Sequence, residues 1–229
     1  MGLRGTNLLV VTFDLLIFDL DGTLVDSLPD ITRALNLALT AAGRAALPSD
    51  IVRGLVGEGV VRLAEKALQA TPATGGKVSA EQVADRIRSV YEAEPCVLTR
   101  LYPGVAETLT TLRAAGRHKL ALLTNKPGVV TRPLLAALKI DTQLDAAIGD
   151  GDGHPRKPDP AAIHALCAQF GTTAARTLMI GDGLPDMAVA RAAGCAAAAA
   201  LWGYTDRAAL LATTPKFALE DVRDLLPIV

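Results

Sequence analysis

The sequence is poor in the residues that build disulfide frameworks and zinc sites. Its 229 residues include three cysteines, at Cys96, Cys167 and Cys195, and none of them stands in a CxxC pair. An odd number of widely spaced cysteines argues against a disulfide-stapled fold or a zinc site. The cysteine pattern therefore predicts a reducing, cytoplasmic environment.

The sequence also lacks a surplus of either charge and an apolar run long enough for a membrane. It has 23 basic and 24 acidic residues, a net charge of -1. Such a balance gives no sign of a nucleic acid or a membrane surface as partner, and a small molecule is expected instead. The apolar run at residues 8–18 is interrupted by Asp14 and leads into Asp19, unlike a signal-peptide core. We interpret its second half as a buried strand and the first dozen residues as an extension without an assigned role.

Short apolar runs alternate with helical patterns along most of the chain. The runs are residues 15–20, 119–124, 146–148, 177–180 and 195–201. Between the first two runs, residues 103–116 place Val105, Leu109 and Leu112 on one stripe and stop at Gly116. This alternation predicts an α/β fold, a Rossmann-like parallel sheet with helices on both faces.

Between residues 26 and 100 the strand pattern gives way to helical patterns. Residues 28–42 carry apolar side chains at helical spacing after Ser27, a predicted N-cap. A further helix is predicted after Ser79 and Gln82, which have the spacing of a capping box. A chain of this length can bury one good core, or one core with a modest insertion, since domains usually run to roughly 100–200 residues. We therefore predict a core formed by residues 1–25 and 101–229 and an inserted α-helical cap domain formed by residues 26–100.

Polar side chains gather where the predicted strands end. Asp19 and Asp21 follow the first strand, Thr124 and Asn125 the second, and Asp182 the fourth. In open α/β sheets, ligands bind outside the carboxyl ends of the strands, so these residues are expected to line one crevice. Two neighbouring carboxylates repel each other unless a cation or a shared proton compensates. The pair thus indicates a divalent metal, an acid/base pair, or both.

Four segments of this sequence carry a family resemblance. They are FDLDGTLVDS at 18–27, LLTNKP at 122–127, RKPDP at 156–160 and IGDGLPD at 180–186. In this order, with a helical insertion after the first, they resemble the haloacid dehalogenase superfamily of phosphatases over nearly the whole chain from about Leu15. Among members with a C1-type helical cap, the similarity is greatest to phosphoglycolate phosphatases, through residues 18–31, 56–63 and 101–116 and the pair Gly203-Tyr204.

The resemblance implies a phosphatase mechanism with two distinct aspartates. Asp19 would be the nucleophile that forms an aspartyl-phosphate. Asp21 would protonate the leaving oxygen and then activate water, so its backbone carbonyl rather than its side chain would face the metal. Asp19, that carbonyl of Asp21 and Asp182 would bind Mg²⁺.

The remaining motif residues are implied to bind the phosphoryl group. The Thr124 hydroxyl, the Asn125 amide and the Lys157 ammonium would neutralise its charge, and Gly22 would also contact the substrate. Asp186 would support Lys157 or the water shell of the metal. One departure from the family pattern is Gly183, which stands where serine is common, so one hydrogen bond is expected to be missing.

The substrate expected from the resemblance is 2-phosphoglycolate, a small phosphorylated metabolite. Its carboxylate would be held by the N–H groups of Gly59 and Val60, with help from Arg53 or Arg62. A preference for this substrate over uncharged monoesters is predicted.

Other functions share parts of this pattern. A phosphatase or phosphomutase that acts on a sugar phosphate would retain all four motifs. A non-catalytic phosphate-binding or receiver-like module phosphorylated on Asp19 would have no use for Asp21. A dehalogenase would need neither the second carboxylate nor magnesium. The sequence leaves open whether the chain is a monomer or a homodimer.

Overall fold

A six-stranded parallel sheet forms the core of the chain, which the computed structural model describes over residues 12–72 and 78–229. The strand order is β5-β4-β1-β6-β7-β8. The bounds are β1 Leu15–Phe18, β4 Lys119–Pro127, β5 Ala146–Asp150, β6 Thr177–Gly181, β7 Ala196–Ala200 and β8 Phe217–Leu219. The predicted α/β fold with a Rossmann-like sheet is confirmed, whereas the extension predicted for the first dozen residues lies, up to residue 11, outside the described residues.

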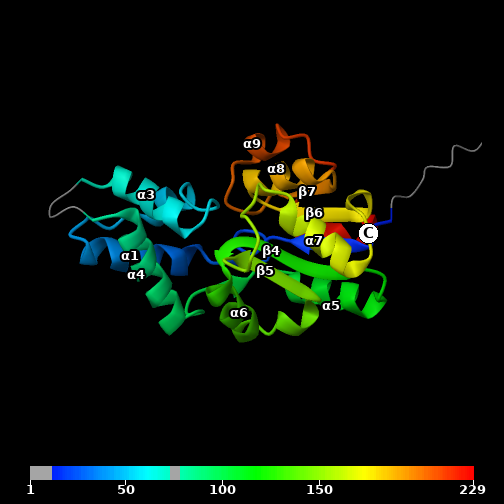
Figure 1. The fold of residues 1–229 in the computed structure, drawn as a ribbon, viewed down its shortest axis with the longest axis horizontal. Coiled ribbons are helices and arrows are strands. Elements are labelled where there is room, and N and C mark those ends of the chain that lie inside the picture. The colour runs from blue at the N-terminus through cyan, green and yellow to red at the C-terminus, as the bar shows by residue number, and fades with distance from the viewer. Residues whose placement is uncertain (1–11, 73–77) are drawn as a thin grey trace, which may run out of the picture.

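Helices cover both faces of this sheet (Figure 1). One face packs against α5 (Val105–Ala115) and α6 (Gly128–Ala137), and the other against α7 (Ala161–Phe170) and α8 (Leu184–Ala193). Helix α9 (Arg207–Leu211) lies between β7 and β8 in the chain, and short 3-10 helices span Asp141–Gln143, Ala174–Arg176 and Val222–Ile228. Within residues 12–72 and 78–229, no helix is both long and apolar enough to cross a membrane.

Strand β1 occupies the middle of the sheet because all four of its residues are apolar. Leu15, Leu16, Ile17 and Phe18 are completely buried, and the strand pairs with β4 on one side and β6 on the other. Leu16 and Phe18 point to the α5/α6 face, while Leu15 and Ile17 point to the α7/α8 face. A strand covered on both faces needs such a continuous apolar run.

The helical insertion predicted after the first strand is confirmed. It consists of α1 (Leu28–Ala41), α2 (Ser49–Arg53), α3 (Val60–Ala70) and α4 (Ala80–Ala93), and Figure 1 shows α1, α3 and α4 grouped at one end of the molecule. We call this insertion the cap. The predicted capping box is present at the start of α4, where Ser79 Oγ accepts from the Gln82 N–H at 3.2 Å and Gln82 Oε1 accepts from the Ser79 N–H at 2.9 Å. The cap has its own apolar cluster, which the core residue Val130 of α6 joins.

A short antiparallel ribbon connects the cap to the core. It is formed by β2 (Val25–Asp26) and β3 (Arg100–Leu101), at the two boundaries that were predicted for the cap. The ribbon, helix α2 and strand β8 were not predicted from the sequence. Strands of two or three residues are too short to show an alternating pattern, which explains why they were missed.

One buried carboxylate in α1 holds the segment that returns from the cap to the core. Asp30 is 3% exposed, and its Oδ2 accepts from the backbone N–H groups of Val97, Leu98 and Thr99 at 3.1, 2.9 and 2.8 Å. The Thr99 hydroxyl donates to the same oxygen at 2.8 Å. Burial alone would raise the pKa of Asp30, but these donors outweigh it and hold the pKa below its ordinary value.

We expect Asp30→Asn to destabilise the protein by about 2–3 kcal/mol near neutral pH, because the amide cannot replace a charged acceptor of several donors. A depressed pKa stabilises the fold above the unfolded-state pKa of about 4, and this stabilisation is lost as the pH falls through the folded-state value. The difference between variant and wild type should therefore shrink below about pH 4. Urea unfolding at several pH values tests this, with Glu92→Gln on the exposed face of α4 as control. Equal stability of both variants at neutral pH would contradict the role of Asp30.

Candidate active site

Three carboxylates meet at the carboxyl ends of the central strands. Asp19 follows β1, Asp182 follows β6, and Asp186 lies in the first turn of α8. Each offers an oxygen within 4.8 Å of the others. They converge because β1 and β6 are neighbouring parallel strands whose ends lie at the same edge of the sheet.

Lys157 neutralises part of this cluster. Its Nζ lies 2.7 Å from Asp19 Oδ1 and 2.6 Å from Asp186 Oδ1, and it donates to the carbonyl of Leu123 at 2.9 Å. Burial alone would lower the pKa of Lys157, but the charges of Asp186 and Asp19 outweigh it and raise the pKa above its ordinary value. Lys157 is therefore a permanent cation between two of the carboxylates.

One lysine does not compensate three closely spaced carboxylates, of which Asp182 and Asp186 are buried and Asp19 is 13% exposed. Burial, with the charge of Asp186, raises the pKa of Asp19 to about 7. Burial, with the charges of Asp19 and Asp186, raises the pKa of Asp182 to about 8. Asp19 Oδ1 is buried against the Lys157 ammonium, 2.7 Å away. An all-oxygen donor set that lacks positive charge fits a hard divalent cation such as Mg²⁺.

The Asp182 side chain is held by groups that sequence reasoning did not identify. Its Oδ1 accepts from the Thr23 hydroxyl at 2.7 Å and its Oδ2 from the Tyr204 N–H at 2.7 Å. Asp182 therefore has a donor on each oxygen even though Gly183 lacks a hydroxyl. The backbone of Gly22, at φ 85°, passes so close that an added Cβ would lie 2.3 Å from Asp182 Oδ2. The Gly22 N–H donates to the carbonyl of Val25 at 2.9 Å, so it is used in the turn rather than directed at a ligand.

Asp21 points away from the carboxylate cluster. Its Oδ1 accepts from the Ser27 hydroxyl at 2.5 Å, and its two oxygens lie 3.1 and 3.2 Å from Lys126 Nζ. Ser27 occupies the predicted N-cap position of α1, but its hydroxyl makes no cap bond and serves Asp21 instead. The side chain of Asp21 is therefore not a member of the metal-type cluster, and ligation through its backbone carbonyl stays a prediction.

Thr124 and Asn125, which are also part of the site, lie in the last residues of β4. The Thr124 hydroxyl accepts from the Lys126 N–H at 3.2 Å, which leaves its own hydrogen free to donate. The Asn125 amide, in contrast, donates to the carbonyl of Gly57 at 3.1 Å and to that of Lys157 at 3.2 Å. Both amide hydrogens are thus used in contacts that connect the cap to the core, while Asn125 also lines the site cavity, and its phosphoryl contact stays a prediction.

The loop that precedes α3 closes over these residues. Besides the Asn125 contact to Gly57, Arg156 Nη1 donates to the carbonyl of Glu58 at 3.3 Å. Gly59 faces the site, and an added Cβ there would lie 2.3 Å from Arg156 Nη1. The cap is thus in contact with the core at Gly57 and Glu58, and these contacts hold it closed.

Arg53 and Arg62, which were expected to bind a carboxylate, do not line the cavity that lies between cap and core. The guanidinium of Arg53 stacks over the ring of Tyr204, 5.5 Å from its centroid. Arg62 is exposed and pairs with Glu58 and Glu65. Both arginines line a second, wider cleft, which Asp182 and Asp186 line together with Asp19, Asp21 and Lys157.

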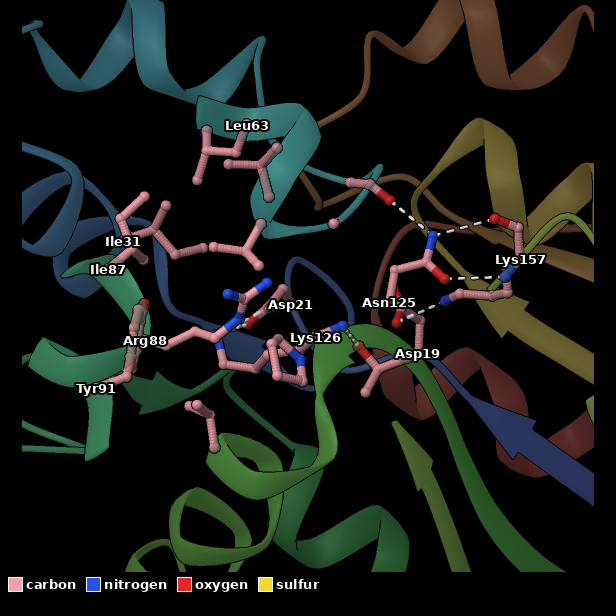
Figure 2. A pocket seen from close by; sticks show the side chains of 17 residues that line it. Asp19, Asp21, Ile31, Leu63, Ile87, Arg88, Tyr91, Asn125, Lys126 and Lys157 are labelled. Carbon is pink, nitrogen blue, oxygen red and sulfur yellow. Dashed lines mark hydrogen bonds and ion pairs between the residues drawn. The ribbon is translucent and has the colours of Figure 1, made fainter. Parts of the chain in front are cut away.

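The cavity between cap and core measures about 80 Å³ (Figure 2). From the core it is lined by Asp19, Asp21, Thr124, Asn125, Lys126 and Lys157, and from the cap by Gly59, Val60, Leu63, Ile87, Arg88 and Tyr91, among others. The core side is therefore charged, whereas the cap side is largely apolar apart from Arg88 and the hydroxyl of Tyr91. So small a space suits a small molecule.

The structure adds functional residues that the sequence analysis did not assign. Lys126 belongs to the quoted segment LLTNKP and Arg156 to RKPDP, so their place in the motifs was a usable signal. Tyr204, which the sequence analysis named only as part of the resemblance, accepts through its hydroxyl from the N–H groups of Ser27 and Leu28 at 2.8 and 3.0 Å. Tyr204 therefore links Asp182 to the start of the cap.

Comparisons with known proteins agree with this geometry. Residues 13–194 match the family of haloacid dehalogenase-like hydrolases. The chain is 37% identical to a phosphoglycolate phosphatase of Haemophilus influenzae over 95% of this chain and 98% of that protein. It is 38% identical to one of Pseudomonas syringae, over 93% and 78%.

A solved structure supports the same relationship. The crystal structure of a predicted phosphoglycolate phosphatase from Haemophilus somnus superposes with a TM-score of 0.88 at 32% identity, covering 94% of this chain and 97% of that one. With this match and with four motifs whose residues converge on one site, the chain belongs to the haloacid dehalogenase-like hydrolases.

Proposed function

We propose that the protein is a magnesium-dependent phosphatase that hydrolyses a small phosphomonoester, 2-phosphoglycolate, through an aspartyl-phosphate on Asp19. The observation that carries this proposal is that two aspartates, only two residues apart in the sequence, lie in different surroundings. Asp19 belongs to the buried cluster with Lys157, whereas Asp21 faces the cavity and is held by Ser27 and Lys126. A nucleophile and a separate acid/base are what a two-step phosphoryl transfer needs.

The residues divide the reaction between them. A carboxylate oxygen of Asp19 attacks phosphorus while the bond to the leaving oxygen breaks, and Asp21 gives that oxygen its proton. Asp21 then takes a proton from water, whose oxygen attacks the phosphorus of the aspartyl-phosphate and releases Asp19 and inorganic phosphate. Lys157 and the free hydrogen of the Thr124 hydroxyl are placed to neutralise the phosphoryl oxygens.

Mg²⁺ fits the carboxylate cluster by charge and by donor type. When bound, it supplies positive charge that lets an ionised Asp19 and an anionic substrate approach each other. Asp19, Asp182 and the backbone carbonyl of Asp21 would hold it, while Asp186 orients Lys157. The names of the relatives support the substrate, since both related sequences are named phosphoglycolate phosphatases and the solved structure is that of a predicted phosphoglycolate phosphatase.

We expect Mg²⁺ to bind more tightly as the pH rises. Metal binding requires ionised carboxylates, and Asp19 and Asp182 have pKa values raised to about 7 and 8. Protons therefore compete with the metal below these values, and the affinity should increase at least about tenfold between about pH 6 and pH 8. Titration calorimetry of the metal-free protein measures this, with Asp182→Asn expected to lose the binding. An affinity that does not change with pH would contradict a site made of these carboxylates.

Substitution of the two aspartates should have different effects. Asp19→Asn removes the nucleophile and should abolish phosphate release. Asp21→Asn should still bind Mg²⁺ and inorganic phosphate but lower kcat by roughly 10²- to 10⁴-fold, the usual contribution of a general acid/base. The exposed Asp50→Asn in α2 serves as the control. A loss below about tenfold in Asp21→Asn would exclude the assigned role of Asp21.

The substrate is tested by kcat/KM for 2-phosphoglycolate against sugar phosphates and p-nitrophenyl phosphate. A site that hydrogen-bonds a carboxylate should favour 2-phosphoglycolate by about 10² or more, because a substrate without that group leaves buried donors unpaired. A preference for a hexose phosphate would retain the phosphatase chemistry and remove this substrate.

A further inference from the structure

The end of the cavity beyond Asp21 carries two cations: Lys126, which pairs with Asp21, and Arg88, which pairs with Asp85. Besides Lys157, Lys126 of β4 and Arg88 of α4 are the cationic side chains lining it among the described residues. Figure 2 shows Arg88 reaching into the cavity from the cap and Lys126 beside Asp21. Lys126 is 8% exposed, and a lysine is rarely buried so deeply unless it meets an anion.

The third polar group at this end is the hydroxyl of Tyr91. Tyr91 is 6% exposed and lines the cavity, and its Oη is buried without a hydrogen-bond partner among the described residues. Its ring lies under the ammonium of Lys126, 4.4 Å from Nζ to the centroid. A buried hydroxyl without a partner costs about 1–3 kcal/mol, so this one is available to a ligand that brings an acceptor.

The position of these groups matches the shape of the proposed substrate. If Asp21 protonates the leaving oxygen, that oxygen lies against the Asp21 carboxyl. In 2-phosphoglycolate a single carbon separates this oxygen from the carboxylate, so the carboxylate must lie close to Asp21 as well. Lys126 Nζ is 3.1 Å from Asp21 Oδ1. Arg53 and Arg62 do not line this cavity, although they line the second cleft, which Asp21 also borders.

We propose that Lys126, together with Tyr91 and Arg88 of the cap, binds the carboxylate of the substrate and sets the preference for it. This inference rests on the proposed function and names the residues that recognise the carboxylate of the substrate. One member comes from the core and two come from the cap, so the carboxylate site is complete only when the cap is closed. The contact from Asn125 to Gly57 holds the cap in that position.

The test separates recognition from turnover by using two phosphonates that cannot be hydrolysed. In 3-phosphonopropionate a methylene replaces the leaving oxygen of 2-phosphoglycolate, and in propylphosphonate a methyl group also replaces the carboxylate. Calorimetry with Mg²⁺ gives both affinities. The wild type should prefer 3-phosphonopropionate by roughly 10- to 100-fold, the range for hydrogen bonds to a charged group.

The variants identify which residues produce that preference. Lys126→Met should reduce it to about threefold or less, and Tyr91→Phe and Arg88→Met should each reduce it by about three- to tenfold. Arg86→Met, exposed on the same helix, should leave it unchanged. The affinity for propylphosphonate in each variant reports whether the phosphoryl site is still formed.

Several results would overturn the inference. The first such result is that Lys126→Met weakens the binding of both phosphonates equally, which would make Lys126 only a positioning residue for Asp21. In another, the preference persists in Lys126→Met, or the wild type shows no preference. Failure of the proposed function has a different signature: the wild type would release no phosphate from any monoester. A preference for 3-phosphonopropionate that depends on Lys126 would then still support the carboxylate site.

Discussion

The mutual repulsion of buried carboxylates is the constraint on which the rest of this site depends. The parallel sheet brings Asp19, Asp182 and Asp186 to one edge, where burial makes each charge costly. Lys157 is fixed by two of these carboxylates and by a backbone carbonyl. The charge of Lys157 is too little for the cluster, and the remaining demand for positive charge is what suits the site to a divalent cation.

The cap is connected to the core through the same polar groups that form the site. Ser27 binds Asp21 at the entry to the cap, and Tyr204 joins Asp182 to the backbone at Ser27 and Leu28. Asn125 joins the cap loop to the backbone of Lys157. A movement of the cap would therefore disturb the site directly. Closure of the cap and formation of the site are therefore linked through shared contacts.

The sequence predicts the sheet, the helical insertion and the motif residues because these depend on local patterns. The apolar run of β1 and the capping box of α4 are examples. It does not predict partners that are set by packing between distant segments: the Ser27 hydroxyl has the pattern of an N-cap, yet the fold gives it Asp21. Arg53 and Arg62 flank the right loop, but the direction in which α2 and α3 present them cannot be read from spacing. Lys126 lies within a recognised motif, while Tyr91, 35 positions earlier, meets it only because α4 packs over the end of β4.

Two like charges stand two residues apart because the turn after β1 sends them into different surroundings. Asp19 remains at the strand end, among carboxylates and Lys157. Asp21 is turned toward the cap, where the Ser27 hydroxyl and the Lys126 ammonium hold it. Neighbouring carboxyl groups whose environments differ in this way can take opposite roles in one reaction, one as nucleophile and the other as proton carrier. Lys126 contacts Asp21, the proposed proton carrier, and is also part of the proposed carboxylate site. Substrate recognition and proton transfer would therefore take place in the same part of the cavity.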